Sequence, residues 1–214
     1  MKALIIGATG AVGKDLTDLL LANENYSEVH IFVRREVAVS HPKLKIHIVN
    51  FDAMDSWKSL IQGDVAFSCL GTTLKTAGSK AAQWKIDYDY QYNFARFAQE
   101  NAVNQYVLVS ASGANPKSFL FYSKMKGQLE EAVKNLNFSC VYILRPPLLV
   151  RKNSDRQGEK IAEKILTFFN RFGLFRSQKP MPTQVVAQAM TILPLKKESG
   201  IFVFSPQKIW KILK

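Results

Sequence analysis

Short apolar runs alternate with amphipathic segments along most of this chain, and this alternation constrains the fold more than any other feature. Six runs of strand length occur before residue 145, at 3–6, 29–33, 45–49, 64–69, 106–109 and 138–144. Helical spacing of apolar residues separates them, at 11–22, 55–60, 79–101 and 122–135, and an exposed charged face is expected on the last of these at Lys126, Glu130, Glu131 and Lys134. This order favours parallel βαβ units. The sequence therefore predicts an α/β fold with a doubly wound parallel sheet.

The pattern changes after residue 144, where we expect a small C-terminal extension over the strand ends. A basic amphipathic helix is predicted at 158–172, a strand at 201–204 and a helix at 206–213. The chain has 214 residues and shows no internal repeat or linker. We therefore expect a single domain at 1–214, with a nucleotide-binding core at 1–144 and a substrate-side extension at 145–214.

Charge is unevenly distributed along the chain. The 29 Lys and Arg residues exceed the 17 Asp and Glu residues by 12, and residues 145–214 hold ten of these twelve excess charges. Such an excess indicates nucleic acid, an anionic membrane or a phosphorylated ligand as partner, without choosing among them. The 158–172 helix is the best support for a membrane or nucleic-acid surface. Packing of its apolar face on the sheet is the simpler interpretation.

The cysteines and histidines restrict compartment and chemistry. Cys69 and Cys140 both lie in apolar strand-like runs, which indicates buried thiols in a reducing compartment rather than a disulfide framework. With no apolar run long enough to span a bilayer, we expect a cytoplasmic protein. The three histidines are scattered, so no metal site is expected.

A GxxGxxG run lies between the first predicted strand and the first predicted helix. Gly7 suits a tight turn, Gly10 allows a pyrophosphate to approach the backbone, and Gly13 allows helix and strand to pack closely. The helix N-terminus adds N–H groups and a positive dipole end. We expect a dinucleotide at this turn, with an ordinary βα turn as the alternative. Its expected binding residues are Gly7, Thr9, Gly10, Ala11, Val12 and Gly13.

Two arginines follow the second predicted strand. Arg34 and Arg35 stand where a site that prefers NAD usually has an acidic residue for the ribose hydroxyl. Guanidinium groups suit a 2′-phosphate, so we expect NADP(H) in preference to NAD(H). The alternative is that both are solvated loop charges. Asp52, after the third strand, is a candidate partner for the adenine amino group or a helix cap.

A YxxxK element begins twelve residues after Ser110, which stands at the end of the fifth predicted strand. Tyr122 and Lys126 share one helix face, where an ammonium would lower the pKa of the phenol and favour proton donation to a carbonyl. Ser110 or Ser112 would hydrogen-bond that carbonyl, although the serines are also typical of a turn. We assign these four residues as candidate catalytic groups.

These stretches together resemble the atypical short-chain dehydrogenase/reductases, in the branch around the Tat-interacting oxidoreductase and its small bacterial relatives. The matching stretches are residues 7–13, 34–35, 69–73, 77–78, 85–88, 110–114, 122–127, Glu130, 145–146 and 156–159. The resemblance implies a Rossmann-like fold that binds NADPH, with Leu70, Gly71 and Thr72 lining the nicotinamide side and Lys126 holding the ribose. Arg145 and Pro146 are counted with the cofactor-binding residues. Family members often have Gly, and two residues later Arg, after the segment that begins at Arg145 in this chain. Here those positions are Arg151 and Asn153.

The sequence thus predicts an NADP(H)-dependent oxidoreductase that transfers hydride to a carbonyl of a small molecule. Phe119, Phe121, Leu148 and Leu149 flank the site in sequence and favour a partly apolar substrate. Two alternatives stay open: a redox-sensing regulator that binds NADP(H) with little or no turnover, and a basic protein of membrane or nucleic-acid surfaces. The substrate and the oligomeric state are not predicted.

Overall fold

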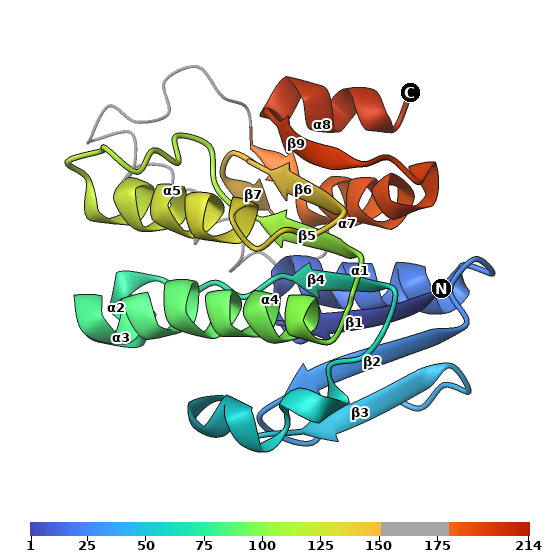
Figure 1. Ribbon diagram of the computed structural model, residues 1–214. Helices are drawn as coiled ribbons and strands as arrows, with labels where there is room; N and C mark the ends of the chain where they lie inside the picture. The colour runs from blue at the N-terminus through green and yellow to red at the C-terminus, as the bar shows by residue number, and fades with distance from the viewer. Residues whose placement is uncertain (151–179) are drawn as a thin grey trace.

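The computed structural model describes residues 1–150 and 180–214 and is built on one seven-stranded parallel sheet. Its strand order is β3-β2-β1-β4-β5-β6-β9 (Figure 1). The strands are β1 (Lys2–Ile6), β2 (Glu28–Val33), β3 (Leu44–Ile48), β4 (Val65–Ser68), β5 (Gln105–Val109), β6 (Cys140–Leu144) and β9 (Gly200–Phe204). The first six follow the order of a Rossmann fold. The predicted fold class is therefore confirmed.

Three helices cover one face of the sheet. They are α1 (Ala11–Ala22), α7 (Thr183–Ile192) and α8 (Pro206–Ile212). Leu16 and Leu20 of α1 and Met190 of α7 are fully buried in the same apolar cluster, and α1 and α7 pack against each other. The Tyr26 hydroxyl donates a hydrogen bond of 2.9 Å to the Thr191 carbonyl and ties the end of α7 to the loop after α1.

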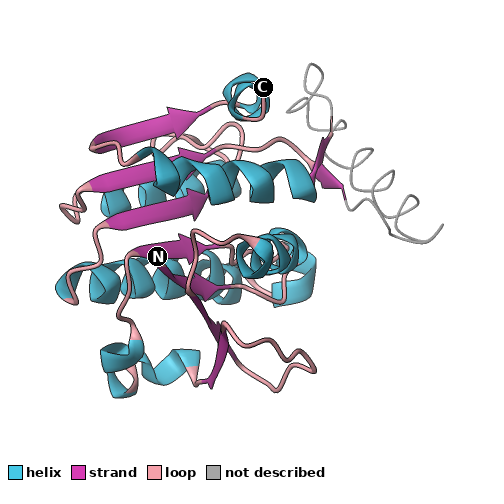
Figure 2. Cartoon of the chain, turned by 90° about the vertical axis from the view of Figure 1, so that its right-hand side faces the viewer, coloured by secondary structure: helices cyan, strands magenta, loops and turns pink. Residues whose placement is uncertain are grey.

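The opposite face is covered by α4 (Tyr90–Glu100), α5 (Phe121–Lys134) and the 3-10 helix η1 (Phe51–Ser56). Figure 2 shows helices on both sides of the strands. Phe94 and Phe97 of α4 and Leu129 of α5 are buried against the sheet. In the described residues, no helix has the length and apolar character needed to cross a membrane.

Two expected helices are broken in the structure. The segment 55–60 forms two 3-10 turns, η1 and η2 (Lys58–Leu60), because Ala53 leaves helical backbone angles and the Asn50 side chain caps η1. The expected helix 79–101 consists of α3 (Lys80–Trp84), a π-helical turn η3 (Lys85–Asp89) and α4. A short helix α2 (Leu74–Ala77), capped by Thr73 and ended by Gly78, precedes them.

The C-terminal part was expected to lie over the strand ends, but in the structure it adds a strand to the main sheet and a helix to one of its faces. β9 pairs in parallel with β6, and α7, which the periodicity did not predict, fills the face beside α1. A second, two-stranded sheet joins β7 (Leu149–Val150) to β8 (Met181–Pro182), and the 3-10 helix η4 (Leu193–Lys196) follows α7. The predicted helix at 158–172 lies outside the described residues.

Burial of α7 against α1 predicts that residues 180–214 unfold together with the N-terminal core. Met190→Ala should lower the free energy of unfolding by about 2–5 kcal/mol, because it deletes a fully buried side chain. Gln184→Ala, on a partly exposed position of the same helix, serves as the control and should change it by about 0.5 kcal/mol or less. Urea unfolding followed by circular dichroism and tryptophan fluorescence measures both. Two separate transitions would contradict a single cooperative unit.

Candidate functional site

The predicted site residues follow the carboxyl ends of five neighbouring strands. Gly7 follows β1, Arg34 follows β2, Cys69 follows β4, Ser110 follows β5 and Arg145 follows β6. Because all these strands are parallel, the segments meet at one edge of the sheet, where ligands bind in open α/β folds. The structure therefore brings together segments that are up to 138 positions apart in the sequence.

The glycine turn is as close-packed as its sequence predicted. Gly7 has a φ of +78°, and a Cβ there would lie 2.5 Å from the carbonyl carbon of Cys69. A Cβ on Gly13 would lie 2.1 Å from the Gly7 oxygen, so α1 can begin here only with glycine. Gly10 is the N-cap of α1 without a side-chain cap. The first-turn N–H groups therefore point to the edge without an acceptor within the helix.

The two arginines after β2 are exposed, whereas Asp52 is held by contacts with two other side chains. Arg34 and Arg35 are exposed, and in residues 1–150 and 180–214 neither makes an ion pair. Asp52 lies in η1, where its Oδ1 accepts from the Tyr90 hydroxyl and pairs with Lys85 Nζ at 2.7 Å. These contacts lower the pKa of Asp52. Its contact with adenine stays a prediction. In the structure, Asp52 joins η1 to η3 and α4.

Asp87 is a fully buried carboxylate in the π-helical turn. Its Oδ1 accepts a hydrogen bond of 2.8 Å from the Thr72 backbone N–H, and its Oδ2 accepts from Gln83 Nε2 at 3.3 Å. Its carbonyl accepts from Gln91 Nε2 at 2.8 Å, which explains why the helix widens here. Burial raises the pKa of Asp87, and the nearby charge of Lys126 opposes that rise. Asp87 thus links the loop after β4 to α5.

Tyr122 and Lys126 lie one turn apart on α5, as predicted, but their electrostatics differ from the prediction. Tyr122 is 38% exposed over the whole residue, yet the pKa of its phenol is raised, first by burial and then by the negative charge of Asp87. The expected lowering by the Lys126 ammonium is therefore wrong for this structure. Lys126 is only 2% exposed; burial lowers its pKa, and Asp87 and Glu130 oppose that shift.

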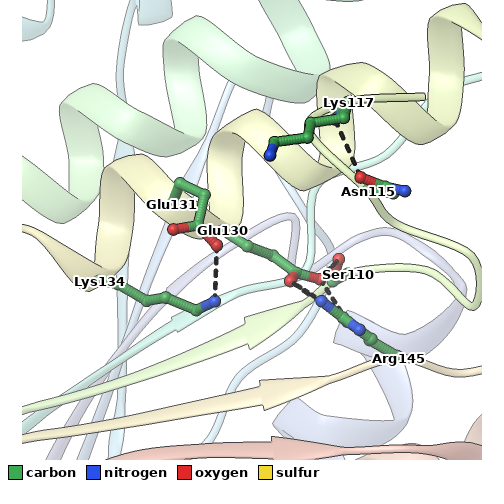
Figure 3. A network of polar contacts seen from close by, with 7 residues as sticks. All are labelled: Ser110, Asn115, Lys117, Glu130, Glu131, Lys134 and Arg145. Atoms are coloured by element: carbon green, nitrogen blue, oxygen red, sulfur yellow. Dashed lines mark hydrogen bonds and ion pairs between the residues drawn. The ribbon is translucent and has the colours of Figure 1, made fainter. Parts of the chain in front are cut away.

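Ser110, Glu130 and Arg145 form a second buried polar group, drawn in Figure 3. The Ser110 hydroxyl donates to Glu130 Oε1 at 2.5 Å, and Arg145 donates from Nε and Nη2 to the same carboxylate at 2.9 and 2.5 Å. A serine hydroxyl carries one proton, so in this arrangement Ser110 does not donate to another acceptor. Ser112 follows in the loop, where its backbone N–H donates to the Pro146 carbonyl at 2.8 Å.

Asp87 and Glu130 are the functional residues that sequence reasoning missed. Lys126 and Glu130 were expected on an exposed helix face, yet both are buried on the side that carries Tyr122. The available signal was spacing, because Tyr122, Lys126 and Glu130 follow one another at intervals of four. An acid one turn after a buried lysine indicates a charge partner.

The described residues also include two free cysteines and His, Asp and Glu side chains of the kind that bind metals. Burial raises the pKa of the Cys69 thiol, which makes this side chain a poor nucleophile. Cys69 and Cys140 form no disulfide. In the part of the chain that the structure describes, no cluster of His, Cys, Asp and Glu could hold a metal ion. Arg151 and Asn153 lie outside that part.

Comparisons with curated proteins find FMP52 proteins of fungi. The chain is 36% identical over 166 residues to the mitochondrial protein FMP52 of Coccidioides immitis, covering 72% of this chain and 68% of that protein. It is 32% identical over 218 residues to mitochondrial fmp52 of Emericella nidulans, covering 96% and 92%. These relatives are named as mitochondrial, which corrects the expectation of a cytoplasmic protein. The expectation failed because reduced cysteines do not distinguish the cytoplasm from other reducing compartments.

Solved structures with the same fold include nucleotide-sugar enzymes and a short-chain dehydrogenase/reductase. MoeE5 in complex with UDP-glucose and NAD superposes with a TM-score of 0.74 at 13% identity, covering 95% of this chain and 75% of that one. A short-chain dehydrogenase/reductase superfamily protein of Agrobacterium tumefaciens with bound NAD gives 0.71 at 12% identity, covering 96% and 77%. At this identity, the likeness shows the fold.

A family model described as NAD(P)H-binding matches residues 7–177, which begin at the glycine turn and include every strand of the sheet except β1 and β9. The match agrees with the resemblance to the atypical short-chain dehydrogenase/reductases and with the geometry of the turn. The chain therefore belongs to the NAD(P)H-binding family of Rossmann-fold proteins.

Proposed function

We propose that this protein is an NADPH-dependent reductase of a carbonyl compound. The observation that carries the proposal is the link through Asp87, which contacts the loop beside the glycine turn and lies next to Tyr122 and Lys126. A dinucleotide on the turn and a proton donor on α5 would then face the same edge of the sheet. Structural neighbours that bind NAD on this fold support the placement.

The residues around the turn fit a phosphorylated dinucleotide. A Cβ at Gly7 or Gly13 would clash with backbone, so these glycines let strand, turn and helix pack closely, and Gly10 would let a pyrophosphate approach the backbone. Arg34 and Arg35 are exposed on the loop that follows β2, where a 2′-phosphate would gain charge-assisted hydrogen bonds. When bound, NADPH would supply the hydride, and Leu70, Gly71 and Thr72 would lie on the nicotinamide side.

Tyr122 keeps the proton that a reduction needs, although its raised pKa makes the phenol a weaker acid than an ordinary tyrosine. Since its pKa lies above the ordinary value of about 10, the phenol keeps its proton at neutral pH. A protonated donor favours reduction of a carbonyl over oxidation of an alcohol. Lys126 would contact the ribose, and Asp87 acts as the positioning residue that keeps the Lys126 ammonium charged despite its burial.

Of the two candidate serines, we propose Ser112 for the hydrogen bond to the substrate oxygen. The Ser110 proton is directed at Glu130, and moving it would leave a buried carboxylate with one contact fewer. Ser110 therefore acts through Glu130 and Arg145 as a positioning residue. Arg145 and Pro146 would hold the cofactor side of the loop that carries Ser112.

The cofactor proposal predicts a selective loss of NADPH affinity in the double variant Arg34→Ala and Arg35→Ala. The Kd for NADPH should rise about 10- to 100-fold, because charge-assisted hydrogen bonds to a phosphate are lost, while the Kd for NADH should change little. Quenching of tryptophan fluorescence during titration measures both. Arg96→Ala, on α4 and paired with Glu100, is the control. Equal losses for both nucleotides would contradict a 2′-phosphate site.

The proton-donor proposal predicts that Tyr122→Phe lowers NADPH oxidation with a panel of aldehydes and ketones by about 100-fold or more. NADPH binding should stay unchanged, and Tyr92→Phe on α4 is the control. In the wild type, the raised pKa of Tyr122 should keep the rate from falling between about pH 7 and pH 9. If no carbonyl compound is reduced, and Tyr122→Phe changes nothing, the redox-sensing alternative holds.

The serine proposal predicts different outcomes for two neighbouring alanine variants. Ser112→Ala should lower kcat about 10- to 100-fold, because it removes a hydrogen bond to the developing charge. Ser110→Ala should lower the free energy of unfolding by about 1–3 kcal/mol, because Glu130 loses a buried donor. Steady-state kinetics and urea unfolding separate the two. The reverse pattern would assign the substrate contact to Ser110.

A further inference from the structure

Exposed apolar side chains gather beside the predicted proton donor. Phe119 is fully exposed and Leu120 is 45% exposed in the loop that leads into α5, and Tyr122 follows them. Leu74 of α2 is 46% exposed. Four of the ten large apolar side chains that the described structure exposes therefore lie in two short segments at the site. Exposed apolar surface of this kind is typical of binding sites.

The same two segments carry only positive charge. Residues 70–86 and 111–129 contain six lysines and no Asp or Glu. Lys126 is buried and Lys85 pairs with Asp52, but Lys75, Lys80, Lys117 and Lys124 are exposed. None of these four makes an ion pair with a carboxylate in the described chain. We call these four lysines, with Phe119 and Leu120, the basic apolar rim.

Aromatic contacts join the two segments of the rim. The rings of Trp84 in α3 and Phe121 in α5 lie 6.2 Å apart, and Lys80 Nζ lies 5.6 Å from the centre of the Phe121 ring. Trp84 also stacks on Tyr88 at 4.8 Å. Figure 1 shows α2, α3 and the start of α5 at the same end of the sheet. The two segments of the rim therefore meet at Phe121, the residue before Tyr122.

Resting on the proposed function, we propose that the substrate is an amphipathic anion: a carbonyl compound with an aromatic or aliphatic body and a negatively charged group. The apolar body would cover Phe119 and Leu120, which now expose hydrocarbon to water. The charged group would be attracted by lysines that have no carboxylate partner in the described chain. A neutral or cationic carbonyl compound of equal size would lack that attraction.

The experiment uses two fluorescent probes that share one ring system. 8-Anilino-1-naphthalenesulfonate carries a sulfonate, and N-phenyl-1-naphthylamine does not. We expect the full-length protein, saturated with NADPH, to bind the sulfonate probe about fivefold more tightly at low salt, with the preference lost at high salt. The double variant Lys75→Glu and Lys80→Glu should abolish the preference. Lys196→Glu with Lys197→Glu, both exposed before the amino end of β9 and so at the opposite edge of the sheet, should keep it.

A second arm identifies the apolar contact and the reaction. Phe119→Ser with Leu120→Ser should weaken binding of both probes by a similar factor. Among substrates, 4-formylbenzoate should be reduced with a higher kcat/KM than benzaldehyde, and Lys75→Glu with Lys80→Glu should remove the difference. If neither aldehyde oxidises NADPH, the proposed reductase fails, while the probe pair still decides whether the rim binds amphipathic anions.

Three outcomes would overturn the inference. The first is equal affinity for the two probes, or a preference that the lysine variants leave unchanged. The second is a dimer in solution that Phe119→Ser converts to a monomer, which would make the rim a contact between copies of this chain. The third is lysine-dependent sedimentation with phosphatidylglycerol vesicles without any preference for the sulfonate probe, which would assign the rim to a membrane surface.

Discussion

The architecture depends on how closely α1 approaches the end of β1. The Gly7 oxygen lies so near Gly13 that any side chain there would occupy the same space, and the positive φ of Gly7 turns the chain toward the helix. The backbone of Cys69 closes the turn from the neighbouring strand. This contact fixes the N-terminus of α1 at the carboxyl edge. It also holds α1 against the sheet, where α7 can pack beside it.

The regular elements of the core could be read from the sequence because their burial leaves a periodic trace. The helix at Ala11–Ala22 and the strands before residue 145 agree with expectation to within about two residues. Helix α7 left no such trace. Val186, Ala187 and Met190 are all buried, since α7 packs against both α1 and α8, so its polar face is reduced to a narrow stripe at Gln184 and Gln188. The π-helical turn was equally hidden, because it depends on hydrogen bonds to Thr72 and Gln91.

The sequence was enough to place the candidate residues at one edge of the sheet. It was not enough to predict the direction of their pKa shifts. Tyr122, Lys126 and Ser110 could be placed at one edge because strand ends converge there. The pKa of Tyr122 is raised instead, first by burial and then by Asp87, which lies 35 positions earlier in the chain and reaches α5 only through the fold. Glu130 was assigned to a solvated face because charged residues on helices usually lie there, yet Arg145 and Ser110 satisfy it in the interior.

The arrangement of charge explains why the interior can be neutral in a strongly basic protein. Asp87 and Glu130 match Lys126 and Arg145 in number, so the group beneath Tyr122 carries no net charge when all four are ionised. Burial of an unmatched ammonium would be costly, and the two carboxylates oppose the lowering of the Lys126 pKa that burial causes. Positive charge lies instead on either side, on Arg34 and Arg35 at the predicted nucleotide end and on the exposed lysines of the rim. Anionic groups of the proposed cofactor and substrate would thereby be attracted to the two ends of the site, on either side of Tyr122.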